Sequence, residues 1–195
     1  MKRLLVVPAL ALALALSACG LSKTNSGGWI VGDGHVEPIA AGDRGNPVDL
    51  TGTTLEGDAF DLASTRGQVT VINVWGAWCA ACLDEASKIE AAHQQLGDDV
   101  AFLGVDIRDT STDQALAYQR NYGITYPSIY SPDGKATLAF ASVVSPRTIP
   151  ATIILDPTGR PATIIRGAVP TTLTLVEAVQ DVEKESSSSP SRGAA

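Results

Sequence analysis

The feature that most constrains the fold is a pair of cysteines placed just after a continuous apolar strand. Residues 69–75 read VTVINVW, and Trp78-Cys79-Ala80-Ala81-Cys82 follows after Gly76 and Ala77. An unbroken β-branched run of this kind is typical of a strand buried on both faces of a sheet. From Cys82 onward the apolar side chains recur at helical spacing, which predicts a helix over residues 82–96. The chain is therefore expected to enclose this strand in a sheet and to begin a helix at the cysteines.

Similar patterns predict the other elements. In chain order we expect a hairpin within 46–62, a strand at 100–107, a helix at 112–122, strands at 151–155 and 162–165, and a helix at 172–185. Ser111 or Thr112 is suited to cap the middle helix, and Gly123 to end it. Residues 156–159 read DPTG, a turn in which proline presets φ and glycine accepts positive φ. This order predicts an α/β fold with a mixed central sheet flanked by helices.

The first 18 residues are predicted to be an export signal. Lys2 and Arg3 precede an apolar run of 13 residues, Leu4 to Leu16. This run is shorter than the about 20 residues of a membrane-spanning helix but suits a signal peptide. It ends in Leu16-Ser17-Ala18-Cys19, which resembles the lipobox of bacterial lipoproteins and predicts lipidation of Cys19. The alternative is an ordinary secretory signal that is cut after Ala18 and leaves a free thiol.

Composition divides the rest of the chain into a tether, a domain and a tail. Residues 19–44 are rich in small and polar side chains and are interpreted as a flexible tether. Within it, Trp29-Ile30-Val31 is expected either to dock on the domain or to form a short strand. Residues 45–185 carry the predicted elements. Residues 186–195 have little to bury and are expected to be disordered. The formal net charge of −7 argues against a nucleic-acid partner, because phosphates attract surplus Lys and Arg.

The cysteine pair favours redox chemistry. Cys79 would lie at the start of the helix, where free N–H groups and the helix dipole stabilise a thiolate, the attacking species. Cys82, one turn later, would be more covered and suited to resolving a mixed disulfide. A structural disulfide closing so short a loop would stabilise the fold little. Half of a zinc site is the other alternative, but only His35 and His93 remain as further nitrogen ligands.

The segment Val71-Ile-Asn-Val-Trp-Gly-Ala-Trp-Cys-Ala-Ala-Cys82 resembles the active-site segment of the thioredoxin superfamily. It is similar to the membrane-tethered, extracytoplasmic branch of ResA/TlpA/DsbE-like thiol:disulfide oxidoreductases, and the resemblance extends over roughly residues 45–185. It implies a thioredoxin-like fold with an N-terminal β-hairpin and a central insertion near 105–130. It also implies a redox-active Cys79–Cys82 disulfide, and no cofactor is expected.

The resemblance also assigns roles to neighbouring residues. Thr148-Ile149-Pro150 matches the cis-proline loop of the family, so Ile149 and Pro150 are expected to contact substrate. Trp78 would shield Cys79 and contact substrate. Glu85 matches a carboxylate of the ResA-like branch and, if buried, would have a raised pKa and exchange a proton with Cys82. A lone glutamate on a helix is more often solvated, and both interpretations stay open.

Several departures from the family leave the direction of electron flow open. Ala81 stands where proline is usual between the cysteines, Ser87 replaces a helix-kinking proline, and Asn73 replaces the buried aspartate of cytoplasmic thioredoxin. The dipeptide between the cysteines supplies no cation to hold a thiolate. Asp106 and Asp109 end a strand near the expected site, where a solvated turn is favoured over a catalytic role.

The leading hypothesis is a lipid-anchored enzyme on the extracytoplasmic face of the membrane. The resemblance implies that it reduces protein disulfides, with the cysteine pair of apocytochrome c before haem attachment as a candidate substrate. An integral-membrane donor of the CcdA/DsbD type would re-reduce it. The alternative is an oxidant of secreted-protein thiols. A peroxiredoxin-type antioxidant is less favoured because Gly76 replaces the expected threonine, and a copper-binding lipoprotein because neither histidine is suitably placed.

Overall fold

The computed structural model describes residues 32–188 of the chain. The predicted signal peptide, Cys19, the Trp29–Val31 segment and residues 189–195 of the predicted tail lie outside the described residues.

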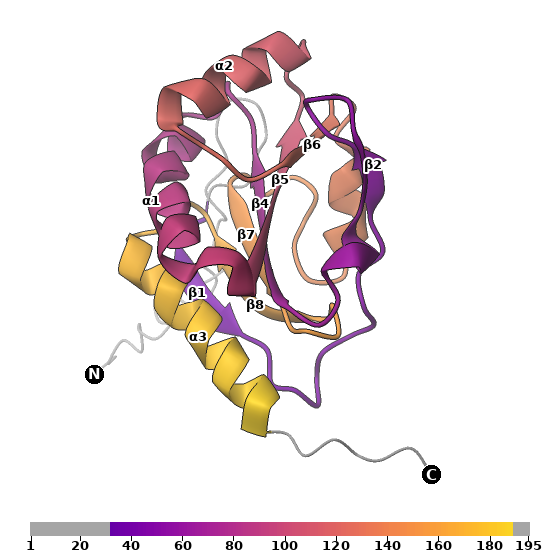
Figure 1. The fold of residues 1–195 in the computed structure, drawn as a ribbon, viewed down its shortest axis with the longest axis vertical. Helices are drawn as coiled ribbons and strands as arrows, with labels where there is room; N and C mark the ends of the chain where they lie inside the picture. Colours follow the sequence, from indigo (N-terminus) through magenta and orange to yellow (C-terminus); the bar gives the residue numbers. More distant parts are fainter. Residues whose placement is uncertain (1–31, 189–195) are drawn as a thin grey trace, which may run out of the picture.

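A mixed six-stranded sheet forms the centre of the molecule (Figure 1). The spatial order is β1 (His35–Pro38), β8 (Pro161–Arg166), β7 (Ala151–Leu155), β4 (Val69–Trp75), β5 (Val100–Ile107) and β6 (Ser128–Ser131). The strands β4, β5 and β6 run parallel to one another, whereas β7, β8 and β1 extend the sheet on the other side of β4 in antiparallel pairs. The predicted α/β class with a mixed sheet is confirmed.

Helices and a hairpin cover the two faces of the sheet. The long helices α1 (Ala80–Leu96) and α3 (Thr172–Ser188) pack together on one face, and α2 (Thr112–Tyr122) lies against α1 (Figure 1). The hairpin of β2 (Thr51–Thr53) and β3 (Ala59–Asp61) lies on the other side together with the 3₁₀ helix η3 (Lys135–Phe140). Two shorter 3₁₀ turns are η1 (Leu62–Thr65) and η2 (Gly97–Asp99).

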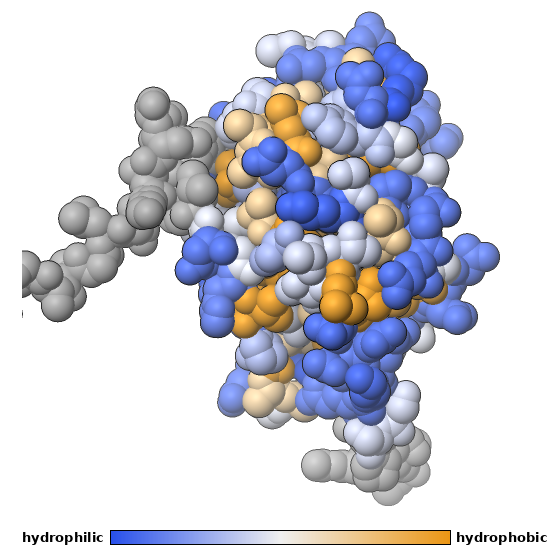
Figure 2. All heavy atoms as spheres, turned by 90° about the vertical axis from the view of Figure 1, so that its left-hand side faces the viewer, coloured by the Kyte–Doolittle hydropathy of each residue, from blue (hydrophilic) through white to orange (hydrophobic). Residues whose placement is uncertain are grey.

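Burial on both faces explains the composition of the central strands. Every residue of β4 and of β7 is buried. Since no position of these strands faces water, alternation of polar and apolar residues is lost and a continuous apolar run results. The helical side has a mostly hydrophilic surface with scattered apolar patches (Figure 2). The hydrophobic core is therefore two layers of side chains, one on each face of the sheet.

Local signals placed most element boundaries correctly. The bounds predicted for β4, β5 and β7 agree with the structure. The hydroxyl of Ser111 accepts a hydrogen bond from the Gln114 N–H, and Gly123 ends α2 in the left-handed conformation. The N-terminal hairpin also forms, with Thr51 and Gly52 inside its first strand.

Several predicted boundaries need correction. The helix α1 begins two residues earlier than predicted, and β8 is one residue longer at each end. Residues 35–38, assigned to the tether, form β1 and pair with β8, so the ordered sheet begins before residue 45. Arg44 is also fixed, because its buried guanidinium contacts Asp156. At the other end, α3 continues to Ser188, beyond the limit expected at residue 185. Within residues 32–188, no helix combines the length and the apolar character needed to span a membrane.

Candidate active site

The cysteine pair lies where β4 passes into α1. Cys79 is the N-cap of α1, and its Sγ accepts a hydrogen bond from the Cys82 N–H at 3.2 Å. The two sulfurs form a disulfide, with the Cα atoms 5.2 Å apart. Sulfur at an N-cap faces the free N–H groups of the first helical turn, which favour a thiolate there once the bond is reduced. The sequence expectation for the position of Cys79 is thus confirmed.

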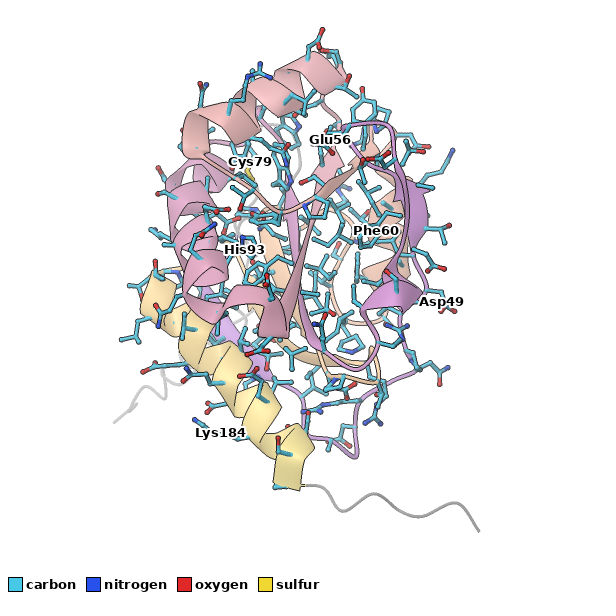
Figure 3. The ribbon with its side chains drawn as sticks, viewed as in Figure 1. Asp49, Glu56, Phe60, Cys79, His93 and Lys184 are labelled. Atoms are coloured by element: carbon cyan, nitrogen blue, oxygen red, sulfur yellow. A yellow bond between two sulfur atoms is a disulfide. The ribbon has the colours of Figure 1, made fainter. Side chains whose placement is uncertain are left out.

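The two cysteines differ in their access to solvent. Cys79 retains 6% exposure, while Cys82 is fully buried. The hydroxyl of Tyr118 on α2 donates a hydrogen bond to the Cys82 carbonyl at 2.8 Å, and the Tyr118 ring stacks on Trp75 of β4. Figure 3 shows Cys79 at the end of α1 beside the central strands. An attacking disulfide or thiol therefore reaches Cys79 before Cys82.

Glu85 is buried one helical turn after Cys82, with 1% exposure. Its Oε1 accepts from the Asn73 side-chain amide, and its Oε2 accepts from the Val169 N–H, both at 2.8 Å. Burial raises the pKa of Glu85 to about 7, although these two hydrogen bonds and nearby Lys88 act in the opposite direction. The carboxyl group can therefore gain or lose a proton near neutral pH.

The loop before β7 lies at the same end of the sheet as the cysteines. The peptide bond between Ile149 and Pro150 is cis, as the sequence predicted. Ala151 pairs with Val74 of β4, which brings the preceding proline beside the end of the strand that leads to Cys79. Ile149 belongs to the same apolar cluster as both cysteines.

Residues 76–78, here called the active-site loop, are tied to the end of β5. The Ala77 N–H donates to Asp109 Oδ2 at 3.0 Å, and the indole N–H of Trp78 donates to the Ile107 carbonyl at 2.9 Å. Trp78 remains 37% exposed next to Cys79. Asp106 and Asp109 are both buried, so the solvated turn expected at this place is wrong.

Sequence reasoning missed three partners of the site. The sequence marks Asn73 only as a departure from the family, yet its side chain contacts Glu85. Val169 and Asp109 supply the other polar contacts. Asn73 and Glu85 are twelve positions apart, and Val169 is 84 from Glu85. The side-chain amide of Asn73 inside the buried strand β4 was the available signal, since buried polar groups need partners.

Comparison with known proteins places the chain among thiol-active relatives. A family model described as the AhpC/TSA family matches residues 45–161. The thiol:disulfide interchange protein DsbE of Allochromatium vinosum is 35% identical over 83 residues, which are 42% of this chain and 44% of that protein. The thiol-disulfide oxidoreductase ResA of Geobacillus thermodenitrificans is 26% identical over 168 residues, covering 85% and 88% respectively.

A solved structure agrees with these matches. A DsbF homologue from Corynebacterium diphtheriae superposes with a TM-score of 0.69 and 30% identity, covering 83% of this chain and 98% of that one. Two curated relatives, the DsbE above and a thioredoxin-like protein of Bacillus subtilis, are spanned by this chain over less than two thirds of their length. The thioredoxin-like fold expected from the sequence is confirmed.

Proposed function

The chain belongs to the AhpC/TSA family, and from this membership and the site geometry we propose that it is a thiol:disulfide oxidoreductase. The observation that carries the proposal is the disulfide between a slightly exposed N-cap Cys79 and a fully buried Cys82. Relatives named as thiol:disulfide interchange proteins and oxidoreductases support the same reaction class. The N-cap position supplies a stabilised thiolate, and the adjacent buried thiol completes a two-electron couple.

The proposed reaction proceeds in two exchanges. In the reduced enzyme, the Cys79 thiolate attacks a disulfide of a partner protein, forms a mixed disulfide and releases one partner sulfur as a thiolate that takes up a proton. Cys82 then loses its proton and attacks the Cys79 sulfur. This step forms the Cys79–Cys82 disulfide and releases the second partner thiol, so two electrons have passed to the partner. The reverse sequence oxidises a partner dithiol.

Glu85 is proposed to handle the proton in the second exchange. Cys82 must be deprotonated to attack, but it is fully buried and has no access to bulk water. Glu85 lies three positions further along α1, on the same side of the helix as Cys82. Its pKa of about 7 suits a group that accepts a proton at neutral pH and later returns it.

The substrate and compartment are proposed from the sequence resemblance. Trp78, Ile149 and Pro150 would contact the partner backbone around its cysteine. Cys19 would carry the lipid anchor and hold the enzyme on the extracytoplasmic face of the membrane. Apocytochrome c is the proposed substrate and a CcdA/DsbD-type membrane protein the proposed electron donor; oxidation of secreted proteins is the alternative. A reduction potential of about −270 mV would favour the reductant, and one of about −120 mV the oxidant.

A peroxidase of the peroxiredoxin type is disfavoured by steric contacts at Gly76. That enzyme class has threonine three positions before its reactive cysteine. A Cβ atom at Gly76 would lie 2.5 Å from the Trp78 indole nitrogen and 2.9 Å from the Ile107 carbonyl oxygen. These distances are shorter than van der Waals contact, so the loop as folded has no room for a threonine.

Substitution of each cysteine tests the proposal. In the full chain, Cys79→Ala should bring the reduction of insulin by dithiothreitol down to the uncatalysed rate, because the attacking sulfur is absent. Cys82→Ser should retain the attack but stop at the mixed disulfide, which accumulates on Cys79 and can be identified by mass spectrometry. Ser87→Ala, an exposed change on the same helix, is the control. An unchanged rate for Cys79→Ala would falsify the mechanism.

Trapping with Cys82→Ser also separates the candidate substrates. Recovery of c-type cytochromes from cells that express the variant would support the reductive maturation role. A broad set of secreted proteins without cytochromes would instead favour the oxidant.

A further inference from the structure

Two aspartates lie beneath the active-site loop and play no part in the exchange described above. Asp106 is the seventh residue of β5 and is fully buried, while Asp109 follows β5 and is 1% exposed. Asp106 pairs in register with Trp75 of β4 on one side and with Tyr130 of β6 on the other. Both carboxyl groups are thus enclosed at the end of the sheet where the cysteine pair is placed.

The hydrogen bonds around this pair are incomplete. Asp109 Oδ2 accepts from the Ala77 N–H, and the Asp109 carbonyl accepts from the Tyr130 hydroxyl at 3.1 Å. Among residues 32–188, no donor reaches either oxygen of Asp106 or the Oδ1 of Asp109. A buried carboxylate without donors is costly, and two adjacent carboxylates cannot both be ionised at low cost. One proton held between the two groups removes both penalties.

The electrostatics agree with this arrangement. Burial raises the pKa of Asp106 far above its usual range, and the neighbouring Asp109 side chain with its negative charge raises it further. At neutral pH Asp106 therefore keeps its proton and can donate it in a hydrogen bond to Asp109. Asp109 then has one oxygen for the Asp106 proton and the other for the Ala77 N–H.

We propose that Asp106 and Asp109 share one proton and act as a positioning pair that holds the active-site loop, and with it Cys79, in the attacking geometry. The expected effect of the pair on the rate of disulfide exchange at Cys79 rests on the proposed function, whereas the sharing of a proton between the two aspartates does not. When Asp106 loses its proton, its negative charge repels the Asp109 carboxylate. This repulsion moves Asp109 away from the Ala77 N–H. The loop then loses the hydrogen bond that joins Ala77 to the segment after β5, and Cys79 is held less firmly.

Few other titratable groups face the pair. Tyr118 of α2 feels the charge of both Asp109 and Glu85, and Tyr130 of β6 contacts the Asp109 carbonyl. Cys79 follows the loop at the start of α1. Arg108 lies between the two aspartates in sequence, and its exposed side chain passes close to Gly134. On η3, Lys135 pairs with the exposed Asp133. The pair consists of aspartates and the other buried carboxyl group near the site is a glutamate, so a label confined to aspartate carboxyls observes the pair alone.

The first test observes the proton directly in the wild-type full chain. The chain is labelled with carbon-13 at aspartate side-chain carboxyls only, so Glu85 gives no signal. We expect an aspartate carboxyl signal characteristic of the protonated form at pH 7, and its loss in Asp106→Asn. Spectra in which every aspartate is ionised at pH 7 would overturn the proposal, whatever the enzyme activity.

The second test measures the position of Cys79. The reduced chain is treated with iodoacetamide, and alkylation of the Cys79 peptide is followed by mass spectrometry between pH 6 and 10. In Asp106→Asn, the asparagine amide can donate a hydrogen bond to Asp109, and this amide does not titrate. The ratio of the Cys79 alkylation rate in Asp106→Asn to that in the wild type should be near unity at pH 7. It should rise about fivefold or more by pH 10, because the pair ionises only in the wild type. Asp113→Asn, at an exposed aspartate of α2, is the control and should show a constant ratio.

The outcomes separate this proposal from the proposed function. A constant ratio for Asp106→Asn over the whole pH range would overturn the positioning role even with the protonated signal present. Absence of insulin reduction by the wild type, combined with the protonated signal and the rising ratio, would sink the proposed function but support the acid pair. If Asp106→Asn does not fold, the wild-type spectra still decide whether a proton is shared.

Discussion

Glu85 shows how the fold changes the chemistry of one residue. Its two hydrogen-bond donors come from β4 and from the segment before α3, and both satisfy the ionised carboxylate. Burial outweighs them, and the pKa rises to about 7. The side chain of Asn73 suits both protonation states, because an amide can donate to a carboxylate and, after rotation, accept from a carboxylic acid. An aspartate at position 73 would instead place a second negative charge beside Glu85.

The raised pKa of Glu85 predicts how stability depends on pH. The folded state holds this proton up to a pH of about 7, whereas an unfolded glutamate, with its ordinary pKa of 4.5, releases it at lower pH. The folded state therefore binds more protons between these values, and its stability falls as pH rises through that window. Glu85→Gln removes the effect. Relative to wild type it should gain up to about 3 kcal/mol between pH 4 and pH 8.

Urea denaturation of both proteins across this pH range is the measurement. Asp84→Asn, an exposed substitution at the preceding position, is the matched control and should leave the pH profile unchanged. A wild-type stability curve parallel to that of Glu85→Gln from pH 4 to 8 would show that Glu85 has an ordinary pKa.

At the scale of elements, the junction of β4 and α1 is supported by a third element, α2. The Tyr118 side chain of α2 contacts both Trp75 and the Cys82 carbonyl. The start of α2 is capped by Ser111, and its end by Gly123 in the left-handed conformation at φ 68°. These caps fix the length of α2 and so the position of Tyr118 behind the cysteines.

Gly123 gives a prediction that isolates backbone conformation. A Cβ atom at Gly123 would touch nothing within 4 Å, and the same is true at Gly42, but only Gly123 has positive φ. Gly123→Ala should therefore destabilise the protein by about 1 kcal/mol, since alanine avoids the left-handed region. Gly42→Ala should have little effect. Thermal unfolding of the two variants checks this, and equal melting temperatures would contradict the assignment.

At the scale of the whole molecule, Arg44 joins three distant segments. Its buried guanidinium contacts Asp156 in the β7–β8 turn, Glu185 near the end of α3 and the Ile39 carbonyl after β1. Arg44 and Asp156 side chains are 4% and 3% exposed. Because both charges are removed from water, loss of Arg44 leaves the Asp156 carboxylate buried with Arg160 as its remaining ion-pair partner, which compensates it less well.

Arg44→Met should therefore cost about 2–4 kcal/mol of unfolding free energy, because it leaves Asp156 with reduced compensation. Urea denaturation at pH 7 is the measurement. Lys184→Met removes a lysine whose pair with Asp181 is 72% and 76% exposed, and it should change stability little. Equal losses from the two variants would argue that the Arg44 cluster is not a structural clamp.

The sequence by itself determined the features that depend on short segments. The β-branched runs predict β4, β5 and β7, Ser111 and Gly123 mark the ends of α2, and the cysteine spacing predicts an N-cap sulfur with a second cysteine one turn later. The family resemblance added the cis-proline before β7. These features follow from local conformational preferences and from side-chain periodicity, which neighbouring residues encode directly.

Only the tertiary structure decided how polar groups are paired. Val169 reaches Glu85 across 84 positions, Asp109 reaches Ala77 across 32, and β1 finds β8 from a segment that looks like a tether. Asp106 and Asp109 have the composition of a solvated turn, and their burial depends on the strands packed on both sides. Burial sets the pKa of a carboxyl group, and burial is a property of the assembled fold. The positions of the cysteines could therefore be predicted from the sequence. The protonation of the buried carboxyl groups near them could not, because it depends on burial in the folded protein.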